Sequence, residues 1–130
     1  MRAIGIDIGT TTICAIVLDS VTGQIIETVT RENNATIAGE NPWERLQNPA
    51  IILENAEAIV EKLINDHAPI ACIGLTGQMH GIVYVDDEGS AVSPLYTWQD
   101  GRGDRAFKDG KSYAQYLSQK TGYRVATGYG

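Results

Sequence analysis

The stretch that decides the fold reads Arg2-Ala-Ile-Gly-Ile-Asp-Ile-Gly-Thr-Thr-Thr-Ile-Cys-Ala-Ile-Val-Leu18. Its first half alternates β-branched with small or polar residues, as strands do. It then breaks at a glycine followed by three threonines before becoming apolar again, so it predicts a β-hairpin. A turn at residues 19–23 and another strand-like segment at residues 24–30 extend the prediction to a three-stranded antiparallel meander.

Beyond the meander the periodicity becomes helical. Asn48-Pro49 is typical of a helix start, and apolar side chains recur every three or four residues from there to about residue 66. The next segment, Ile70-Ala-Cys-Ile-Gly-Leu75, is apolar throughout, which predicts a strand covered on both faces in a parallel arrangement. This order of elements predicts an α/β fold with a mixed sheet.

The remaining segments give weaker signals. Residues 31–47 are polar and predict a loop. Residues 82–85 and 92–98, on either side of a tight turn, predict a second hairpin, and residues 104–120 predict a weakly amphipathic helix.

Composition excludes several classes of protein. A length of 130 residues with 43% apolar and 20% charged side chains suits one folded domain and argues against disorder. The net charge of −6 disfavours a general nucleic-acid or anionic-membrane surface. No apolar run is long enough to cross a bilayer and no secretory signal precedes the first strand, so we expect a cytoplasmic protein without membrane or nucleic-acid partners.

The first motif that can carry chemistry is Asp7-Ile-Gly-Thr-Thr-Thr12, at the predicted strand end and turn. A glycine there lets the backbone approach a phosphate, and hydroxyl and N–H groups can donate to its oxygens. The carboxylate can hold Mg²⁺ directly or through water. A plain hairpin, in which Asp7 and Thr10 bind the turn backbone, accounts for the same residues, so the motif alone leaves both interpretations open.

The second motif, Gly77-Gln-Met-His-Gly81, follows the predicted buried strand, at the strand end where open α/β sheets bind ligands. Two glycines let the backbone turn and expose three long side chains. The side chains of Gln78 and His80 suit a polyol, and Met79 can contact an apolar sugar edge. By itself the pentapeptide is better explained by a structural histidine beside a core methionine.

The third motif, Tyr96-Thr-Trp-Gln-Asp-Gly-Arg102, ends the predicted second hairpin. An indole face offers a platform for a sugar ring, and an aspartate and an arginine two residues apart can bind adjacent hydroxyls or each other. A surface ion pair beside a core tryptophan is the alternative interpretation.

Together, and in this order, the three motifs resemble the N-terminal portion of the FGGY carbohydrate kinases, over residues 4–130. The second motif is similar to the xylulokinase and sedoheptulokinase version of the sugar-contacting segment. The third motif, followed by Val125-Ala-Thr-Gly-Tyr-Gly130, is more similar to sedoheptulokinases. The resemblance implies an actin-like ATPase (ribonuclease H-like) fold, present here in part, whose mixed sheet starts with the antiparallel meander.

The resemblance also implies an activity: transfer of a phosphoryl group from Mg-ATP to a sugar, a ketose such as sedoheptulose or xylulose. It implies two sets of ligand-binding residues. The residues facing the phosphates and Mg²⁺ are Asp7, Gly9, Thr10 and Thr11, with Asp7 as the metal ligand, directly or through water. Those lining the sugar site are Gln78, Met79, His80, Trp98, Asp100 and Arg102.

The family pattern extends beyond this sequence. In these kinases the general-base aspartate and most adenine contacts come later in the chain, so we expect the base beyond Gly130. We expect residues 1–130 to form the N-terminal part of the first, sugar-binding actin-like domain, without the rest of that domain or the second, ATP-binding one. Such a piece should be inactive alone, and its uncovered apolar surface should cause self-association.

Two other functions stay open at this point. An actin-like ATPase of the chaperone kind shares the first motif, although it lacks the second and third. A non-catalytic sugar-binding module would keep the sugar residues alone. Titration with ketoses and with Mg-ATP separates these cases, whereas the sequence does not identify the sugar.

Overall fold

The computed structural model describes residues 1–129, so Gly130, the last residue of the sequence motif at 125–130, lies outside the described residues. The chain divides into two compact units. The first contains residues 1–35 and 50–78, and the second contains residues 36–49 and the chain from residue 79 onward.

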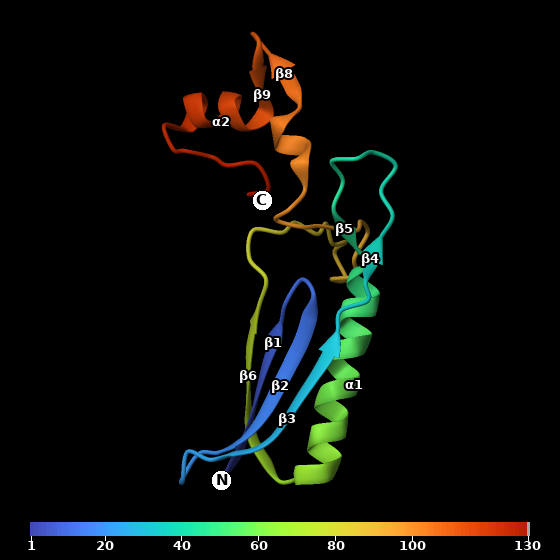
Figure 1. Cartoon of the computed structure of the whole chain (residues 1–130), viewed down its shortest axis with the longest axis vertical. Helices are drawn as coiled ribbons and strands as arrows, with labels where there is room; N and C mark the ends of the chain where they lie inside the picture. Colours follow the sequence, from blue (N-terminus) through green and yellow to red (C-terminus); the bar gives the residue numbers. More distant parts are fainter. Residues whose placement is uncertain (130) are drawn as a thin grey trace. The chain divides into compact units, whose positions relative to one another are not determined.

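The first unit is built on a four-stranded sheet in the order β3-β2-β1-β6 (Figure 1). Its strands are β1 (Arg2–Ile8), β2 (Thr12–Asp19), β3 (Ile25–Glu32) and β6 (Ile70–Gly77). β1 pairs antiparallel with β2, β2 pairs antiparallel with β3, and β6 runs parallel to β1. The predicted antiparallel meander and mixed sheet are therefore confirmed.

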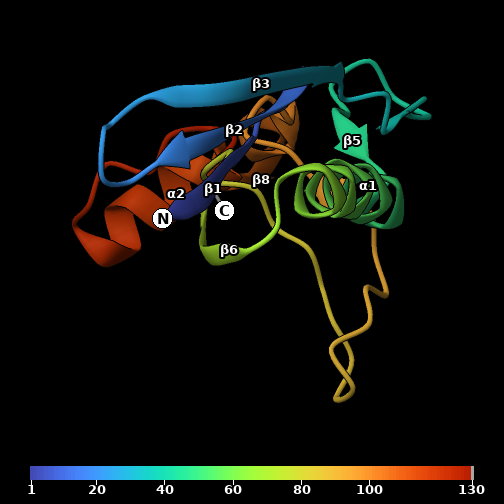
Figure 2. The same cartoon turned by 90° about the horizontal axis from the view of Figure 1, so that it is seen from below.

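Helix α1 (Pro49–His67) covers one face of this sheet, as the end-on view in Figure 2 shows. It begins at the predicted proline, where the missing N–H costs no helical hydrogen bond. Strand alternation turns every second apolar residue of β1 and β2 toward the helix, whose buried residues recur at helical spacing. The resulting core cluster contains Ile4, Ile6, Ile13, Ala15, Val17, Ala56, Ile59 and Leu63.

The prediction that residues 70–75 are covered on both faces is wrong. Residues 71–77 are exposed, and the side chains of Ile73 and Leu75 are 49% and 72% accessible. The reason is position: β6 is an edge strand, and the buried face of α1 packs mainly on β1 and β2. An uninterrupted apolar run does not by itself reveal whether a strand lies at the centre or at the edge.

The second unit contains a sheet of three very short strands in the order β4-β5-β7. They are β4 (Thr36–Ile37), β5 (Leu46–Gln47) and β7 (Leu95–Tyr96), so the predicted loop over residues 31–47 is interrupted by two strands. The predicted hairpin over residues 82–98 is reduced to β7 and two isolated bridges, Ile82 with Tyr96 and Val85 with Ala91. Its turn is present, because the Asp86 carboxylate accepts hydrogen bonds from two backbone N–H groups within it.

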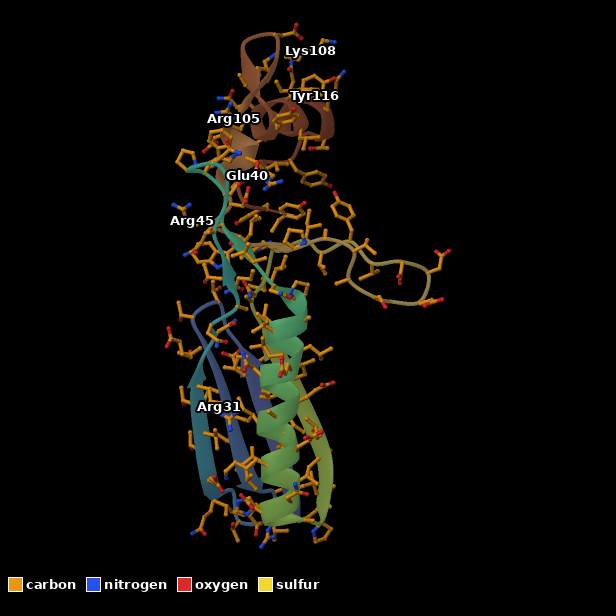
Figure 3. The ribbon with its side chains drawn as sticks, turned by 90° about the vertical axis from the view of Figure 1, so that its right-hand side faces the viewer. Arg31, Glu40, Arg45, Arg105, Lys108 and Tyr116 are labelled. Atoms are coloured by element: carbon orange, nitrogen blue, oxygen red, sulfur yellow. The ribbon has the colours of Figure 1, made fainter. Side chains whose placement is uncertain are left out.

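The predicted helix over residues 104–120 is correct only in its second half. The segment starts with a 3-10 turn, η1 (Gly101–Asp104), and a small hairpin of β8 (Ala106–Lys108) and β9 (Lys111–Ser112). Helix α2 (Tyr113–Thr121) follows; Figure 3 labels Lys108 on the hairpin and Tyr116 on α2. Within residues 1–129, no helix combines the length and apolar character that crossing a membrane requires.

Candidate functional site

The predicted phosphate-binding residues lie together at the turn between β1 and β2. The Gly9 N–H donates to the Thr12 carbonyl oxygen at 2.9 Å, which closes the turn. A Cβ atom on Gly9 would lie only 2.8 Å from that oxygen, so the turn requires glycine. The Asp7 side chain is exposed near the end of β1, between the inward-facing positions of Ile6 and Ile8 on the alternating strand.

Asn33, which no sequence motif indicated, stabilises this turn by hydrogen bonds to its backbone. Its side-chain amide donates to the Gly9 carbonyl at 2.8 Å, and its backbone N–H donates to the Thr11 carbonyl at 2.8 Å. Its own side-chain oxygen accepts from the Ala35 N–H at 3.3 Å, and the residue is only 5% exposed. Because Gly9 and Thr11 are more than 20 residues away in the sequence, no local pattern indicates that Asn33 binds this turn.

Gln78, predicted as part of the sugar set, contacts the turn between β1 and β2. The Thr10 hydroxyl donates to the Gln78 side-chain oxygen at 3.1 Å, and the Gln78 N–H donates to the Ile8 carbonyl at 2.9 Å. A Cβ on Gly77 would lie 3.1 Å from the same Ile8 oxygen, so the glycine allows this close approach of β6 to β1. Gln78 thus belongs to the first unit, whereas the other predicted sugar residues belong to the second.

In the second unit, three predicted sugar residues line one pocket of about 190 Å³: His80, Asp100 and Arg102. Its other walls include the side chains of Ile82, Tyr96, Leu117, Val125 and Tyr129. The two remaining predicted residues, Met79 and Trp98, are not among the lining residues; their side chains are 69% and 48% accessible.

Asp100 is the most constrained group of this pocket. It is 2% exposed, and its Oδ1 accepts from Arg102 Nε at 2.6 Å and from the Arg102 N–H at 3.1 Å. Its Oδ2 accepts from Arg102 Nη2 and from the Arg45 N–H, both at 3.1 Å. A carboxylate offers about four acceptor positions, so those of Asp100 are already occupied.

These contacts decide the ionisation of Asp100. Burial raises the pKa of its carboxyl, but the hydrogen bonds from Arg102 and from the Arg45 and Arg102 N–H groups outweigh burial and leave that pKa below its ordinary value. The Asp100 hydrogen bond in turn raises the pKa of Arg102. The pair is therefore a carboxylate and a guanidinium held in bidentate geometry.

Arg102 is fixed from a second side. Its guanidinium carbon lies 4.1 Å from the centroid of the Tyr96 ring, a cation–π contact. Of the five guanidinium N–H groups, Asp100 takes two, and the remaining N–H groups can donate to a ligand oxygen in the pocket. Arg102 is thus a preoriented cationic donor, with Asp100 as the group that orients it.

Comparison with known proteins places the chain in a family. Residues 2–130 match the N-terminal domain of the FGGY family of carbohydrate kinases. The chain belongs to this family. Both the resemblance drawn from the three motifs and the actin-like α/β fold that it implies are thereby confirmed.

Individual FGGY relatives are similar over most of this chain. A xylulose kinase of Staphylococcus xylosus is 30% identical over 82% of the chain, and the human sedoheptulokinase is 31% identical over 98% of it. A solved "xyloylose kinase" structure from Brucella ovis superposes with a TM-score of 0.82 and 26% identity over 99% of this chain and 27% of its own. The matches span 22% and 31% of the lengths of the two curated relatives.

Membership of this kinase family implies that Mg²⁺ is bound together with the nucleotide phosphates. One residue of this chain, Asp7, has a side chain suited to that ion. Within residues 1–129, no group of three His, Cys, Asp or Glu side chains could hold a metal. Mg²⁺ with a nucleotide, however, needs only one or two carboxylates, since phosphate oxygens and water complete its coordination. The exposed Asp7 carboxylate, near the turn between β1 and β2, suits that partial role.

Proposed function

We propose that residues 1–130 are part of a kinase that transfers the γ-phosphoryl group of ATP to a hydroxyl group of a ketose such as xylulose or sedoheptulose. The pocket of the second unit carries the proposal, because His80, Asp100 and Arg102 bring polar groups to one volume of about 190 Å³. Relatives that are xylulose kinases and sedoheptulokinases support a ketose.

The two units have separate tasks in this proposal. In the first, Asp7 holds Mg²⁺ directly or through water, and the Gly9–Thr11 backbone and hydroxyl groups bind the phosphates. Bound Mg²⁺ neutralises part of the phosphate charge. Gln78 keeps the Thr10 hydroxyl in place through the 3.1 Å hydrogen bond between them.

In the second unit, the sugar lies in the pocket against His80 and Arg102, and the part that projects from the pocket contacts Met79 and Trp98, which do not line it. Arg102 donates to a sugar oxygen, while Asp100 acts through Arg102, because its own acceptor positions are filled. These residues bind and orient the sugar so that one hydroxyl faces the γ-phosphorus in line. The base that accepts the hydroxyl proton comes from outside residues 1–130, and so do most adenine contacts. We therefore expect no phosphorylation by residues 1–130 alone.

The decisive test is a phosphorylation assay of the full-length protein that contains these residues, with xylulose, sedoheptulose and glycerol as acceptors. ATP-dependent ketose phosphate formation is the expected result. Calorimetric titration with each ketose and with Mg-ATP supplies the other outcomes. Binding of nucleotide without sugar would identify a chaperone-type ATPase, and binding of sugar without nucleotide would identify a non-catalytic binding module.

Substitution of Trp98 tests the sugar site within that assay. The half-exposed indole should contact the sugar, so Trp98→Ala should raise the ketose KM by the equivalent of about 1–2 kcal/mol, roughly 5–30-fold. The KM for ATP should stay nearly constant. Tyr123→Ala, an exposed aromatic residue that belongs to none of the three motifs, is the matched control and should change neither value. Equal losses for both ligands in Trp98→Ala would show a general structural role.

A further inference from the structure

The segment of residues 125–129, hereafter the tail, is fixed at several points within the second unit. The Val125 N–H donates to the Ser118 hydroxyl oxygen of α2 at 2.8 Å. The Thr127 hydroxyl donates to the Asp104 carboxylate at the end of η1. The Tyr129 N–H donates to the Ala126 carbonyl at 3.2 Å, which turns the chain back. These contacts give the tail a defined path although it contains no helix or strand.

Gly128 brings the tail into direct contact with the Trp98 backbone. Its φ is +83°, in the left-handed region, and a Cβ atom there would lie 1.8 Å from the Trp98 carbonyl oxygen. No residue with a Cβ atom fits at this position, because a carbon atom cannot approach a carbonyl oxygen so closely without a bond between them. The glycine of the Val-Ala-Thr-Gly-Tyr motif therefore seats the tail on the segment that carries Trp98, Asp100 and Arg102.

Tyr129, the next residue, stacks on His80. The two ring centroids are 4.2 Å apart and the planes differ by 8°. His80 also has a positive φ of 63°, which is uncommon outside glycine and persists where surrounding contacts enforce it. The Tyr129 ring provides such a contact, since it covers one face of the imidazole.

Stacking decides how the imidazole can bind a ligand. Both nitrogens of histidine make hydrogen bonds in the ring plane, so a ring lying flat against His80 sets that plane without covering the nitrogens. Both rings line the same pocket as Arg102. The tail thus supplies one wall of the pocket and also orients a polar group on another.

We propose that Tyr129 is a positioning residue of the sugar site: it fixes the imidazole plane of His80 and forms a wall against the apolar edge of the sugar, and Gly128 makes this placement possible. The inference rests on the proposed sugar-kinase function for its ligand. The stacking itself is independent of that function.

A spectroscopic test uses the chain of residues 1–130 with labelled histidine. It has only two histidines, and His67 serves as an internal reference in the first unit. Ring stacking should move the His80 ring proton signals upfield in the native chain and in Tyr129→Phe. Tyr129→Leu should remove this shift and leave His67 unchanged, and Tyr123→Leu, in an exposed tyrosine nearby, should leave both histidines unchanged.

Sugar affinity is then measured in the full-length protein. An aromatic pair contributes about 0.5–1.5 kcal/mol beyond its burial, so Tyr129→Leu should weaken ketose binding by roughly twofold to tenfold. Tyr129→Phe should restore the affinity, and Mg-ATP affinity should not change in either variant. Gly128→Ala should reproduce the loss while retaining the tyrosine ring.

Two results would overturn the proposal: a His80 signal that is unaffected by Tyr129→Leu, or unchanged ketose affinity in Tyr129→Leu after the shift has been lost. Failure of the proposed function has a different signature. In that case the native protein shows the upfield His80 signal and binds no ketose, so the stacking stands and the sugar assignment is wrong. Loss of the native amide signals of α2, which lies in the same unit as Tyr129, identifies a variant whose second unit has unfolded, and Tyr129→Phe and Gly128→Ala then decide.

Discussion

The two units are held together by different kinds of contact. In the first, eight buried apolar residues pack between the sheet and α1. In the second, Ala114 is the one buried apolar residue among those described, and the other buried residues, Gln47, Thr97 and Asp100, are polar. There the backbone of Arg45 receives hydrogen bonds from Thr97 and donates one to Asp100.

The two kinds of contact do different things: apolar burial stabilises the first unit, and directional contacts orient side chains in the second. Apolar burial is non-directional, so many residues of the first unit share its stabilisation and the ladder hydrogen bonds supply the geometry. Hydrogen bonds and stacked rings are directional, so the second unit can hold Arg102 and His80 in set orientations, but it depends on a few residues to do so. Substitutions in each unit can test whether a loss of stability in one unit is confined to that unit.

The largest expected effect is in the first unit. Leu63 is fully buried, so Leu63→Ala should lower the free energy of unfolding by about 2–5 kcal/mol through lost burial and a residual cavity. Urea denaturation measures the change. Leu53→Ala, on the exposed side of the same helix at 59% accessibility, is the control and should cost less than about 0.5 kcal/mol. Similar losses at both positions would contradict a core located between α1 and the sheet.

Asp100→Ala should produce the next largest effect, concentrated in the second unit. It leaves the Arg45 and Arg102 N–H groups and the guanidinium without their partner, at a cost of about 2–4 kcal/mol. Hydrogen exchange should show lost amide protection around residues 45 and 102, with β1 and β2 still protected. Asp87→Ala, in an exposed turn, is the control; loss of protection across both units would refute separate stabilisation.

A smaller effect is expected from Asn33→Ala. It removes the donor to the Gly9 carbonyl and the acceptor for the Ala35 N–H, which should cost about 1–2 kcal/mol and loosen the turn. Mg-ATP affinity of the full-length protein should fall while ketose affinity is kept. The neighbouring Asn34 makes a surface hydrogen bond with Asn55, so Asn34→Ala should leave both affinities unchanged.

The smallest effect is a pH dependence at the end of α1. The hydrogen bond from His67, followed by that from Lys62, lowers the pKa of Glu27 below its ordinary 4.5. A lowered carboxyl pKa stabilises the folded state above the unfolded pKa, and this contribution is lost as pH falls through the folded value. The stability that Glu27 contributes relative to Glu27→Gln should therefore decline as pH falls below about 4.5, as urea denaturation at a series of acidic pH values would measure. A difference that does not decline below that pH would contradict a lowered Glu27 pKa.

The first unit was predictable because its signals are periodic and local. Alternation predicted β1 to β3, and the proline with its apolar stripe predicted α1. The prediction that β6 is covered on both faces was wrong. Apolar residues such as Ile73 and Leu75 occur both in central and in edge strands of a sheet, so the sequence does not distinguish the two positions. Asn33 was missed because its contacts with the turn depend on the folded sheet.

The second unit was harder to predict because its structure depends on side-chain hydrogen bonds. Two local signals could have corrected the predicted helix over residues 104–120. Asp109-Gly110, with φ values of 54° and 71°, is a hairpin turn sequence, and Ser112 with Gln115 forms a capping box that starts α2. The role of Asp100 is different, because only the fold brings the Arg45 N–H to its carboxylate.

The path of the chain has a practical consequence. The first unit is left after residue 35 and re-entered at residue 50, so a gene divided near residue 40 would put β3 and α1 on different polypeptides. A division after Gln78 would keep all four strands and α1 on one polypeptide, together with the hydrogen bond from Thr10 to Gln78. For fragment complementation, a split after Gln78 therefore keeps the first unit whole, and residues 36–49 on the same polypeptide would have to pair with the second polypeptide through β5 and β7.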